Sequence, residues 1–443
     1  MKNTDSNNTV KKWYRLDNAA KIYPATATST WEAIFRISVT FKDEIDHEKL
    51  QIALERTSKR MPSIAARVRK GFFWYYLEQS DRKPILQQDV QNPCMKMSED
   101  ENEGYNFRVR VYGKRVSLEV YHALGDGGGG FTFMKTMCAE YLGLKGTEIP
   151  PYKGILNCDE PPKPEEMEDG HNKFSKFRIN EKRADKRAYV IKGTREPIDV
   201  VHIVSGTMPA DMIAKKAKEK GLTVTEYLAG ILCYIIYKVQ ADENPRKKRP
   251  VIILLPVDLR AFYETQTMRN FTYFLLAGID PNYGEFTQDE IFNEIRCFMR
   301  KNLNEKYLNA KISKNVKAER VPVLRVVPLF LKNIAMRITY EFAGDSRNSM
   351  TISNMGRVDM PKEMAEHIDK VDFFLSRSRF TNVNCTVGSF NNNMVINFTR
   401  AIKEPYIERA FFRELVNQGI PVTIESNREY ENTRLDENTS SHL

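Results

Sequence analysis

Residues that build metal sites and disulfide frameworks are scarce in this chain of 443 residues, which contains six cysteines and six histidines. The cysteines are widely spaced, none forms a Cys-x-x-Cys pair, and none lies at metal-ligand spacing from a histidine. We therefore expect no bound metal, and scattered thiols of this kind are typical of a reducing compartment. The cysteines are Cys94, Cys138, Cys158, Cys233, Cys297 and Cys385.

Long apolar runs are also missing. The longest stretches, 228–237 and 251–257, are much shorter than the roughly 20 residues that a transmembrane helix needs. The first ten residues are polar and lack the apolar core of a secretion signal. We therefore expect no stable insertion into a membrane and a cytoplasmic location.

The excess of positive charge comes without the pattern of a nucleic-acid-binding protein. The formal net charge is +10, and two short basic runs, 182–187 and 246–249, hold much of the excess. No zinc-finger spacing, aromatic-rich sheet signature or basic helix accompanies them. We expect no nucleic-acid partner and interpret the charge as a solvated surface with a general attraction for anionic ligands.

Length and composition predict a globular protein with two lobes. Domains usually comprise about 100–200 residues, and 41% of this chain is hydrophobic, which is enough for sizeable cores. Prolines and runs of charge concentrate between residues 150 and 198, which favours a crossover there. The expected parts are a flexible N-terminus (1–12), an N-terminal lobe (13–160), a linker (161–198), a C-terminal lobe (199–424) and a flexible tail (425–443).

Hydrophobic periodicity predicts strands and helices in both lobes. Gly113 and Lys114 form a tight turn between two alternating strands and predict a hairpin. The expected strands are 31–41, 72–77, 107–112, 115–121, 200–205, 251–256, 350–353, 371–375, 382–390 and 393–399. The expected helices are 47–59 after an Asp46 cap, 131–142, 210–220, 225–239 after a Thr223 cap, 288–301 and 407–418.

The hairpin leads directly into His122, which begins the segment His-Ala-Leu-Gly-Asp-Gly-Gly-Gly-Gly. A histidine has an ordinary pKa of about 6.5 and can take a proton from a hydroxyl, amine or thiol near neutral pH. Asp126 can accept hydrogen bonds within the loop or pair with an arginine. The glycines, Gly127 among them, remove side chains where a substrate or another backbone must come close. His122 is therefore the leading candidate for a general base.

The pattern His-x-x-x-Asp-Gly, between a hairpin strand and a helix, resembles the core motif of a superfamily of acyltransferases that use coenzyme A or a carrier protein. That superfamily includes chloramphenicol acetyltransferase and the condensation domains of peptide synthetases, and the details here are most similar to bacterial alcohol acetyltransferase-like proteins. Further segments match in order and spacing, so the resemblance covers about residues 12–420. These segments are 16–24, 256–260 with 268–271, and 353–357.

This resemblance implies an α/β (α+β) fold of two chloramphenicol-acetyltransferase-like lobes, each a mixed sheet flanked by helices, with the active-site tunnel between them. It implies that His122 is the general base that activates an alcohol or amine acceptor. The implied donor is acyl-CoA, with acetyl as the expected group, or an acyl carrier protein, and no cofactor is bound. Asp126 is then mainly structural and pairs with Arg260 or, as second choice, with Arg269.

Four other residues are expected to bind or support the substrate. Ser353 or Asn354 is a candidate to hydrogen-bond the oxyanion or the acyl chain, and Asn270 lies in one of the matching segments. Tyr121 stands where many members of the superfamily carry a first histidine, so the substrate range could differ. One chain already supplies both lobes of the cleft, so we expect a monomer.

Two other functions compete with this interpretation. Residues 125–130 also fit G-x-G-x-x-G, but an antiparallel hairpin precedes them and a proline-rich segment follows, which disfavours a dinucleotide site. A catalytically silent module could use the same fold to bind a carrier protein or a hydrophobic ligand. The intact set of His122, Asp126 and Gly127 favours the enzyme. The motif does not separate a coenzyme A donor from a carrier-bound donor.

Overall fold

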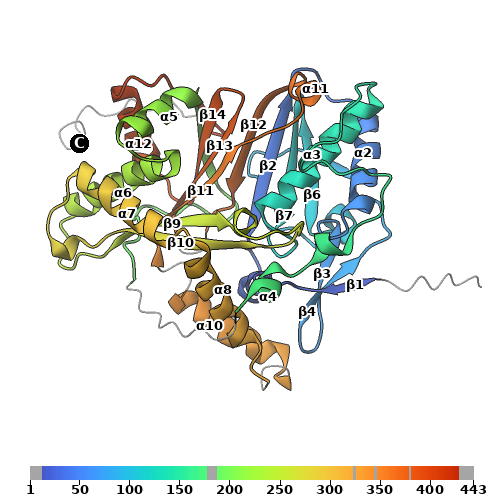
Figure 1. Ribbon diagram of the computed structural model, residues 1–443, viewed down its shortest axis with the longest axis horizontal. Helices are drawn as coiled ribbons and strands as arrows, with labels where there is room; N and C mark the ends of the chain where they lie inside the picture. Colours follow the sequence, from blue (N-terminus) through green and yellow to red (C-terminus); the bar gives the residue numbers. More distant parts are fainter. Residues whose placement is uncertain (1–11, 177–186, 323–325, 344–346, 379–380, 429–443) are drawn as a thin grey trace, which may run out of the picture.

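The computed structural model describes residues 12–176, 187–322, 326–343, 347–378 and 381–428. Two large sheets dominate it, and they lie side by side in Figure 1. The first sheet has five strands in the order β12-β2-β7-β6-β5 and is mixed, because β5 runs parallel to β6. Its strands are β2 (Ile34–Phe41), β5 (Leu86–Gln88), β6 (Phe107–Tyr112), β7 (Arg115–Tyr121) and β12 (Ile368–Leu375).

The second sheet has seven strands in the order β10-β9-β11-β13-β14-β8-β15, and β11 runs parallel to both of its neighbours. Its strands are β8 (His202–Pro209), β9 (Val251–Asp258), β10 (Thr272–Ile279), β11 (Met350–Arg357), β13 (Val383–Phe390), β14 (Asn393–Arg400) and β15 (Thr423–Ser426). A small third sheet contains β1 (Trp13–Arg15), β4 (Tyr75–Gln79) and β3 (Ala66–Lys70).

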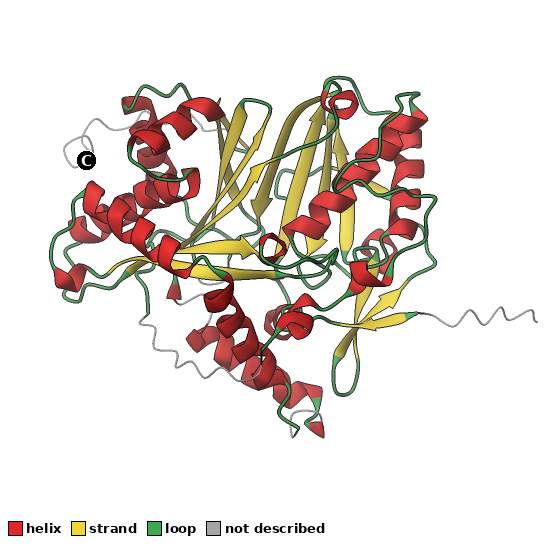
Figure 2. Ribbon diagram, viewed as in Figure 1, coloured by secondary structure: helices red, strands yellow, loops and turns green. Residues whose placement is uncertain are grey.

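Helices pack on both large sheets, as Figure 2 shows. In the first lobe α3 packs on β2 and β7 with α2 beside it, and in the second lobe α6 packs on β9 and α7 on β10. Each lobe has its own hydrophobic core. The helices are α1 (Ile22–Thr26), α2 (His47–Arg60), α3 (Gly127–Leu144), α4 (Gly170–Phe174), α5 (Ala210–Glu219), α6 (Val224–Asp242), α7 (Gln288–Asn302), α8 (Glu305–Glu319), α10 (Leu329–Ala343), α11 (Lys362–Ala365) and α12 (Tyr406–Asn417).

Local sequence signals account for several helix starts. The Asp46 side chain accepts a hydrogen bond from the Lys49 N–H, and Thr223 forms a reciprocal capping box with Glu226, so both expected caps are confirmed. In the described residues no single helix is long and apolar enough to cross a bilayer, although α5 and α6 together, bent by 79°, meet the length and composition.

β12 comes late in the sequence but belongs to the first sheet. It pairs antiparallel with β2 along its length. It also lies against the second sheet, because the Thr386 hydroxyl and the Asn397 Nδ2 both donate to the Phe373 carbonyl, at 2.5 and 2.9 Å. The range 199–424, expected to form one C-terminal lobe, therefore contains an edge strand of the other lobe's sheet.

Several local expectations differ from the structure, and three of them follow. The strand expected over 72–77 is β4, which starts only at Tyr75, because Phe72 and Phe73 lie in an exposed turn after the unexpected strand β3. The helix expected over 131–142 starts at Gly127, because Asp126 caps it. The tail expected from residue 425 begins as part of β15, which pairs with β8, while 429–443 and 1–11 lie outside the described residues.

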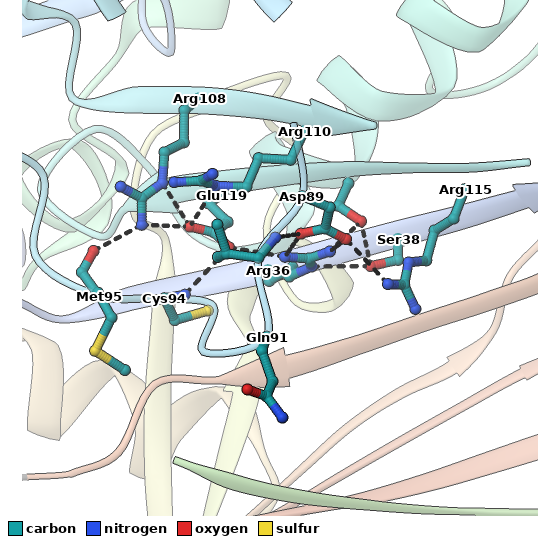
Figure 3. Close-up of polar contacts among 12 residues, drawn as sticks. Arg36, Ser38, Asp89, Gln91, Cys94, Met95, Arg108, Arg110, Arg115 and Glu119 are labelled. Carbon is teal, nitrogen blue, oxygen red and sulfur yellow. Dashed lines mark hydrogen bonds and ion pairs between the residues drawn. The ribbon is translucent and has the colours of Figure 1, made fainter. Parts of the chain in front are cut away.

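A network of buried charges lies on the first sheet, on the strand faces opposite the hydrophobic core (Figure 3). Glu119 on β7 accepts from Arg108 Nε at 2.7 Å and from Arg36 Nη1 at 3.0 Å, and Arg36 also pairs with Asp89. Burial alone would raise the pKa of Glu119, but Arg108 and Arg36 hold that pKa below its ordinary value. Breaking such a buried pair typically costs about 3–5 kcal/mol, because the remaining charge is left buried without a partner.

Candidate active site

A cavity of about 1260 Å³ lies where the two lobes meet, and its lining comes from both sheets. Along β9 the side chains alternate: one face packs in the core, and the other, including Leu254 and Pro256, lines the cavity. The apolar run 251–256, expected as a strand, therefore contributes both to the core and to the cavity wall. Of the predicted site residues, the lining includes His122, Asp126, Gly127, Arg260, Ser353 and Asn354.

His122 is held at the cavity wall by contacts on its ring and its backbone. The Tyr23 ring stacks on the imidazole with centroids 4.5 Å apart, and Phe35 makes an edge contact at 5.2 Å. The His122 N–H donates to the Ala33 carbonyl at 2.8 Å. The residue is half-buried, so its ring is fixed in position while part of it stays accessible from the cavity.

Asn270 determines which ring nitrogen of His122 carries the proton. The Asn270 Nδ2 donates to the His122 carbonyl at 3.0 Å and to Asp17 Oδ2 at 3.3 Å, so the amide oxygen is the atom that faces His122 Nδ1, at 2.9 Å. Nδ1 is therefore the protonated donor, and Nε2 keeps its lone pair. Burial lowers the pKa of His122 below its ordinary value, so the neutral imidazole is favoured near pH 7.

Asp126 ties the loop to the second lobe. Its two carboxylate oxygens accept from Arg260 Nη1 and Nη2, both at 3.0 Å. They also accept from the Phe271 N–H at 2.7 Å and from the Gly129 N–H at 3.2 Å. Burial alone would raise the pKa of Asp126, but Arg260 holds that pKa below its ordinary value. The carboxylate is thus ionised and fully engaged in contacts that hold the lobes together.

Arg269, the second candidate partner of Asp126, lies in a different contact. Its Nε is 3.4 Å from Asp17 Oδ2, and its Nη2 donates to the Arg15 carbonyl at 2.7 Å. Burial raises the pKa of Asp17, and Arg269 opposes this effect. Asp17 therefore stands behind Asn270 in a buried chain that ends at His122. Asp17 lies in one of the matching segments, 16–24, but nothing in the sequence indicated that it contacts Asn270.

The remaining predicted residues divide between the cavity and the core. On β11, Asn354 is already engaged, because its Nδ2 donates to Thr225 Oγ1 at 2.9 Å and its Oδ1 accepts from the Gly356 N–H at 2.8 Å. Ser353 also lines the cavity. Tyr121, expected near the substrate, is instead 3% exposed and packs in the core of the first lobe, because it still belongs to β7.

The glycines after Asp126 allow α3 to start against the backbone of the second lobe. A Cβ added to Gly129 would lie 2.1 Å from the Met268 carbonyl oxygen, which no side chain tolerates. At Gly127 the nearest atom to such a Cβ is Met355 Cε at 3.9 Å, an ordinary contact. The expected close approach of another backbone is therefore tightest at Gly129, two residues after the last residue of the motif, Gly127.

No family model matches the chain, and neither does any curated protein. Solved structures match over nearly its full length. TRI3 trichothecene 15-O-acetyltransferase from Fusarium sporotrichioides has a TM-score of 0.58 at 10% identity, covering 92% of this chain and 95% of that one. F. sporotrichioides TRI101, complexed with coenzyme A and T-2, has a TM-score of 0.60 at 9% identity, covering 94% and 100%. The first condensation domain of the CDA synthetase has a TM-score of 0.55 at 12% identity, covering 93% and 95%.

The chain has the fold of two-lobed acyltransferases and condensation domains. The fold class expected from the sequence is confirmed. Within this two-lobed fold, His122 lies at the cavity between the lobes, and the contact between Asp126 and Arg260 joins the lobes.

Proposed function

We propose that the protein transfers an acyl group from a thioester to an alcohol or an amine, with His122 as the general base. The observation that carries the proposal is the position of the His122 ring at the wall of a large cavity, with its Nδ1 held by the Asn270 amide oxygen at 2.9 Å. This contact leaves Nε2 as the basic nitrogen, and the lowered pKa of His122 favours the neutral ring. Nε2 takes the acceptor proton as the acceptor oxygen or nitrogen bonds to the thioester carbon. The C–S bond then breaks, and the same proton passes to the departing thiolate.

The donor we propose is acyl-CoA, with acetyl as the transferred group and no bound cofactor. A similar structure, TRI101, was solved with coenzyme A, which supports this choice. The similarity to a condensation domain supports the alternative of a carrier-bound thioester. Both donors are anionic, and the net charge of +10 would attract either one.

Ser353 is our candidate for stabilising the negative charge that develops on the carbonyl oxygen. It lines the cavity on β11, whereas the side-chain amide of the neighbouring Asn354 is already hydrogen-bonded to Thr225 and Gly356. Loss of one oxyanion donor typically raises the barrier by about 2.7–4 kcal/mol. Ser353→Ala should therefore lower kcat by about 100-fold or more, with little change in thermal stability.

The proposal can be tested by following thiol release colorimetrically while the purified chain is offered acetyl-CoA and a panel of alcohols and amines. His122→Ala should lower the rate by at least about 100-fold. His47→Ala, at the exposed start of α2, is the matched control and should behave as the unaltered chain does. Equal rates for the unaltered chain and His122→Ala would reject the general base. No thiol release from either acyl-CoA or an acyl carrier protein would favour a silent binding module.

A further inference from the structure

Helix α10 presents chemically different faces to the cavity and to the outside. Successive residues of a helix are about 100° apart, so Lys332 and Met336 fall on one side, and both line the cavity. Phe330, Ile334 and Ile338 recur every four residues on the other side, and each is more than half exposed. The described part of the chain therefore leaves an apolar stripe of α10 uncovered.

The turn between β3 and β4 enlarges this stripe. The Phe72 carbonyl accepts from the Leu329 N–H at 3.0 Å, and Lys332 Nζ donates to the Phe73 carbonyl at 2.9 Å, so the turn is fastened to the start of α10. Contiguous apolar surface of this kind marks an interaction site. The resulting apolar patch consists of Phe72, Phe73, Phe330, Leu331, Ile334 and Ile338, which are between 41% and 73% exposed.

Positive charge accompanies the apolar patch. The described residues 305–322 and 326–343, which include α8 and α10, contain seven Lys or Arg residues and three Glu. Lys70, just before the turn, and Arg337, on α10, are both exposed. A helix with one exposed apolar face and cations around it is typical of proteins that bind the surface of an anionic bilayer.

We propose that the apolar patch docks on an anionic lipid surface. Figure 1 shows α8 and α10 projecting from the body of the molecule, and a projection of this kind suits a deformable lipid layer better than it suits a groove. The cavity starts directly behind the patch, because Trp74 and Lys332 are part of its lining. If the proposed acyl transfer holds, a membrane-dissolved amphiphile with a hydroxyl or amine can pass from the lipid, behind α10, to His122.

Flotation of the full chain with lipid vesicles tests the docking. We expect the chain to float with vesicles of phosphatidylglycerol and phosphatidylcholine (1:1) at low salt, and binding to weaken as salt screens the charges. Phe330→Ser combined with Ile334→Ser should reduce the bound fraction by at least about tenfold, because apolar insertion is lost. The matched control is Ile52→Ser combined with Val416→Ser, which alters two apolar residues of similar exposure on α2 and α12. Thermal unfolding checks that all variants are folded.

His122→Ala should float as the unaltered chain does, so that docking and catalysis are judged separately. Absence of binding to either mixed or pure phosphatidylcholine vesicles would overturn the proposal. An equal loss in the Ile52 and Val416 control would also overturn it. The docking proposal would also be overturned if no variant binds vesicles and the patch variant loses self-association or binding to an acyl carrier protein. The apolar patch would then be a protein interface.

Discussion

Replacing Asp126 with alanine should destabilise the protein, because one carboxylate serves three partners. The substitution removes one of the two ion pairs of Arg260, whose side chain is 18% exposed and keeps its contact with Asp258 at 3.0 Å. It also removes the acceptor for the N–H groups of Phe271 and Gly129. A buried pair broken to leave an uncompensated charge typically costs about 3–5 kcal/mol, and the remaining contact with Asp258 lowers that cost for Arg260. An unpaired N–H typically costs about 1–3 kcal/mol and a lost helix cap about 1 kcal/mol. Since the three contacts share one side chain, their costs do not add fully, and we expect the free energy of unfolding to fall by about 2–4 kcal/mol.

Urea unfolding followed by circular dichroism measures this loss. Asp46→Ala is the matched control, because Asp46 also caps a helix but its ion pair with Lys49 is exposed, so only about 1 kcal/mol should be lost. Asp126→Asn keeps an oxygen acceptor without the charge and should fall between the two. If Asp126→Ala costs no more than Asp46→Ala while thioester turnover collapses, the structural role of Asp126 is refuted and the carboxylate acts in the chemistry.

Three further predictions concern the same site. Gly129→Ala should lower the melting temperature by several degrees, because its Cβ would stand 2.1 Å from the Met268 carbonyl oxygen. Gly143→Ala, in the same helix with no atom within 4 Å of such a Cβ, should not lower it, and equal shifts would contradict the steric argument. The pH profile of kcat/KM should be flat above about pH 6.5 and fall only below it, because the neutral form of His122 is the base and burial lowers its pKa; an acidic limb centred above that value would refute this. Asn270→Ala should lower kcat/KM by at least about tenfold and move the acidic limb to lower pH, because the bond to Nδ1 stabilises the imidazolium; an unshifted limb would leave Asn270 a purely structural role.

Elements with strong local signals could be predicted from the sequence, whereas their pairing could not. The hairpin of β6 and β7 is confirmed at both bounds, because two alternating strands flank a tight turn of two residues. The strand β12 was expected near residues 371–375, but its partner β2 lies more than 300 residues away. Alternation also reveals a polar face on β6 without showing that Arg108 is buried against Glu119.

Within the site, the sequence identified the residues but few of their contacts. His122 was expected at a cavity and lies there, and its position at the end of a hairpin strand, just before a helix, is a local feature of the sequence. For the partner of Asp126 the sequence offered Arg260 as first choice and Arg269 as second, and the structure shows Arg260. Both arginines lie in the same connection between β9 and β10, and only the folded structure shows which one reaches the carboxylate. The support that Asp17 gives to Asn270 depends on three distant segments meeting, and no single stretch of sequence encodes it.

The C-terminal part of the chain supplies β12 to the first sheet, and this affects both the synthesis of the protein and its division into fragments. During synthesis the first sheet can be completed only after residues 368–375 have left the ribosome, because these residues form β12, the strand that pairs with β2. A fragment that stops near residue 176 would present β2 as a bare edge, and unpaired edges of this kind recruit strands from other chains. Separately produced halves should therefore recombine into a functional protein only when the second half carries β12 intact.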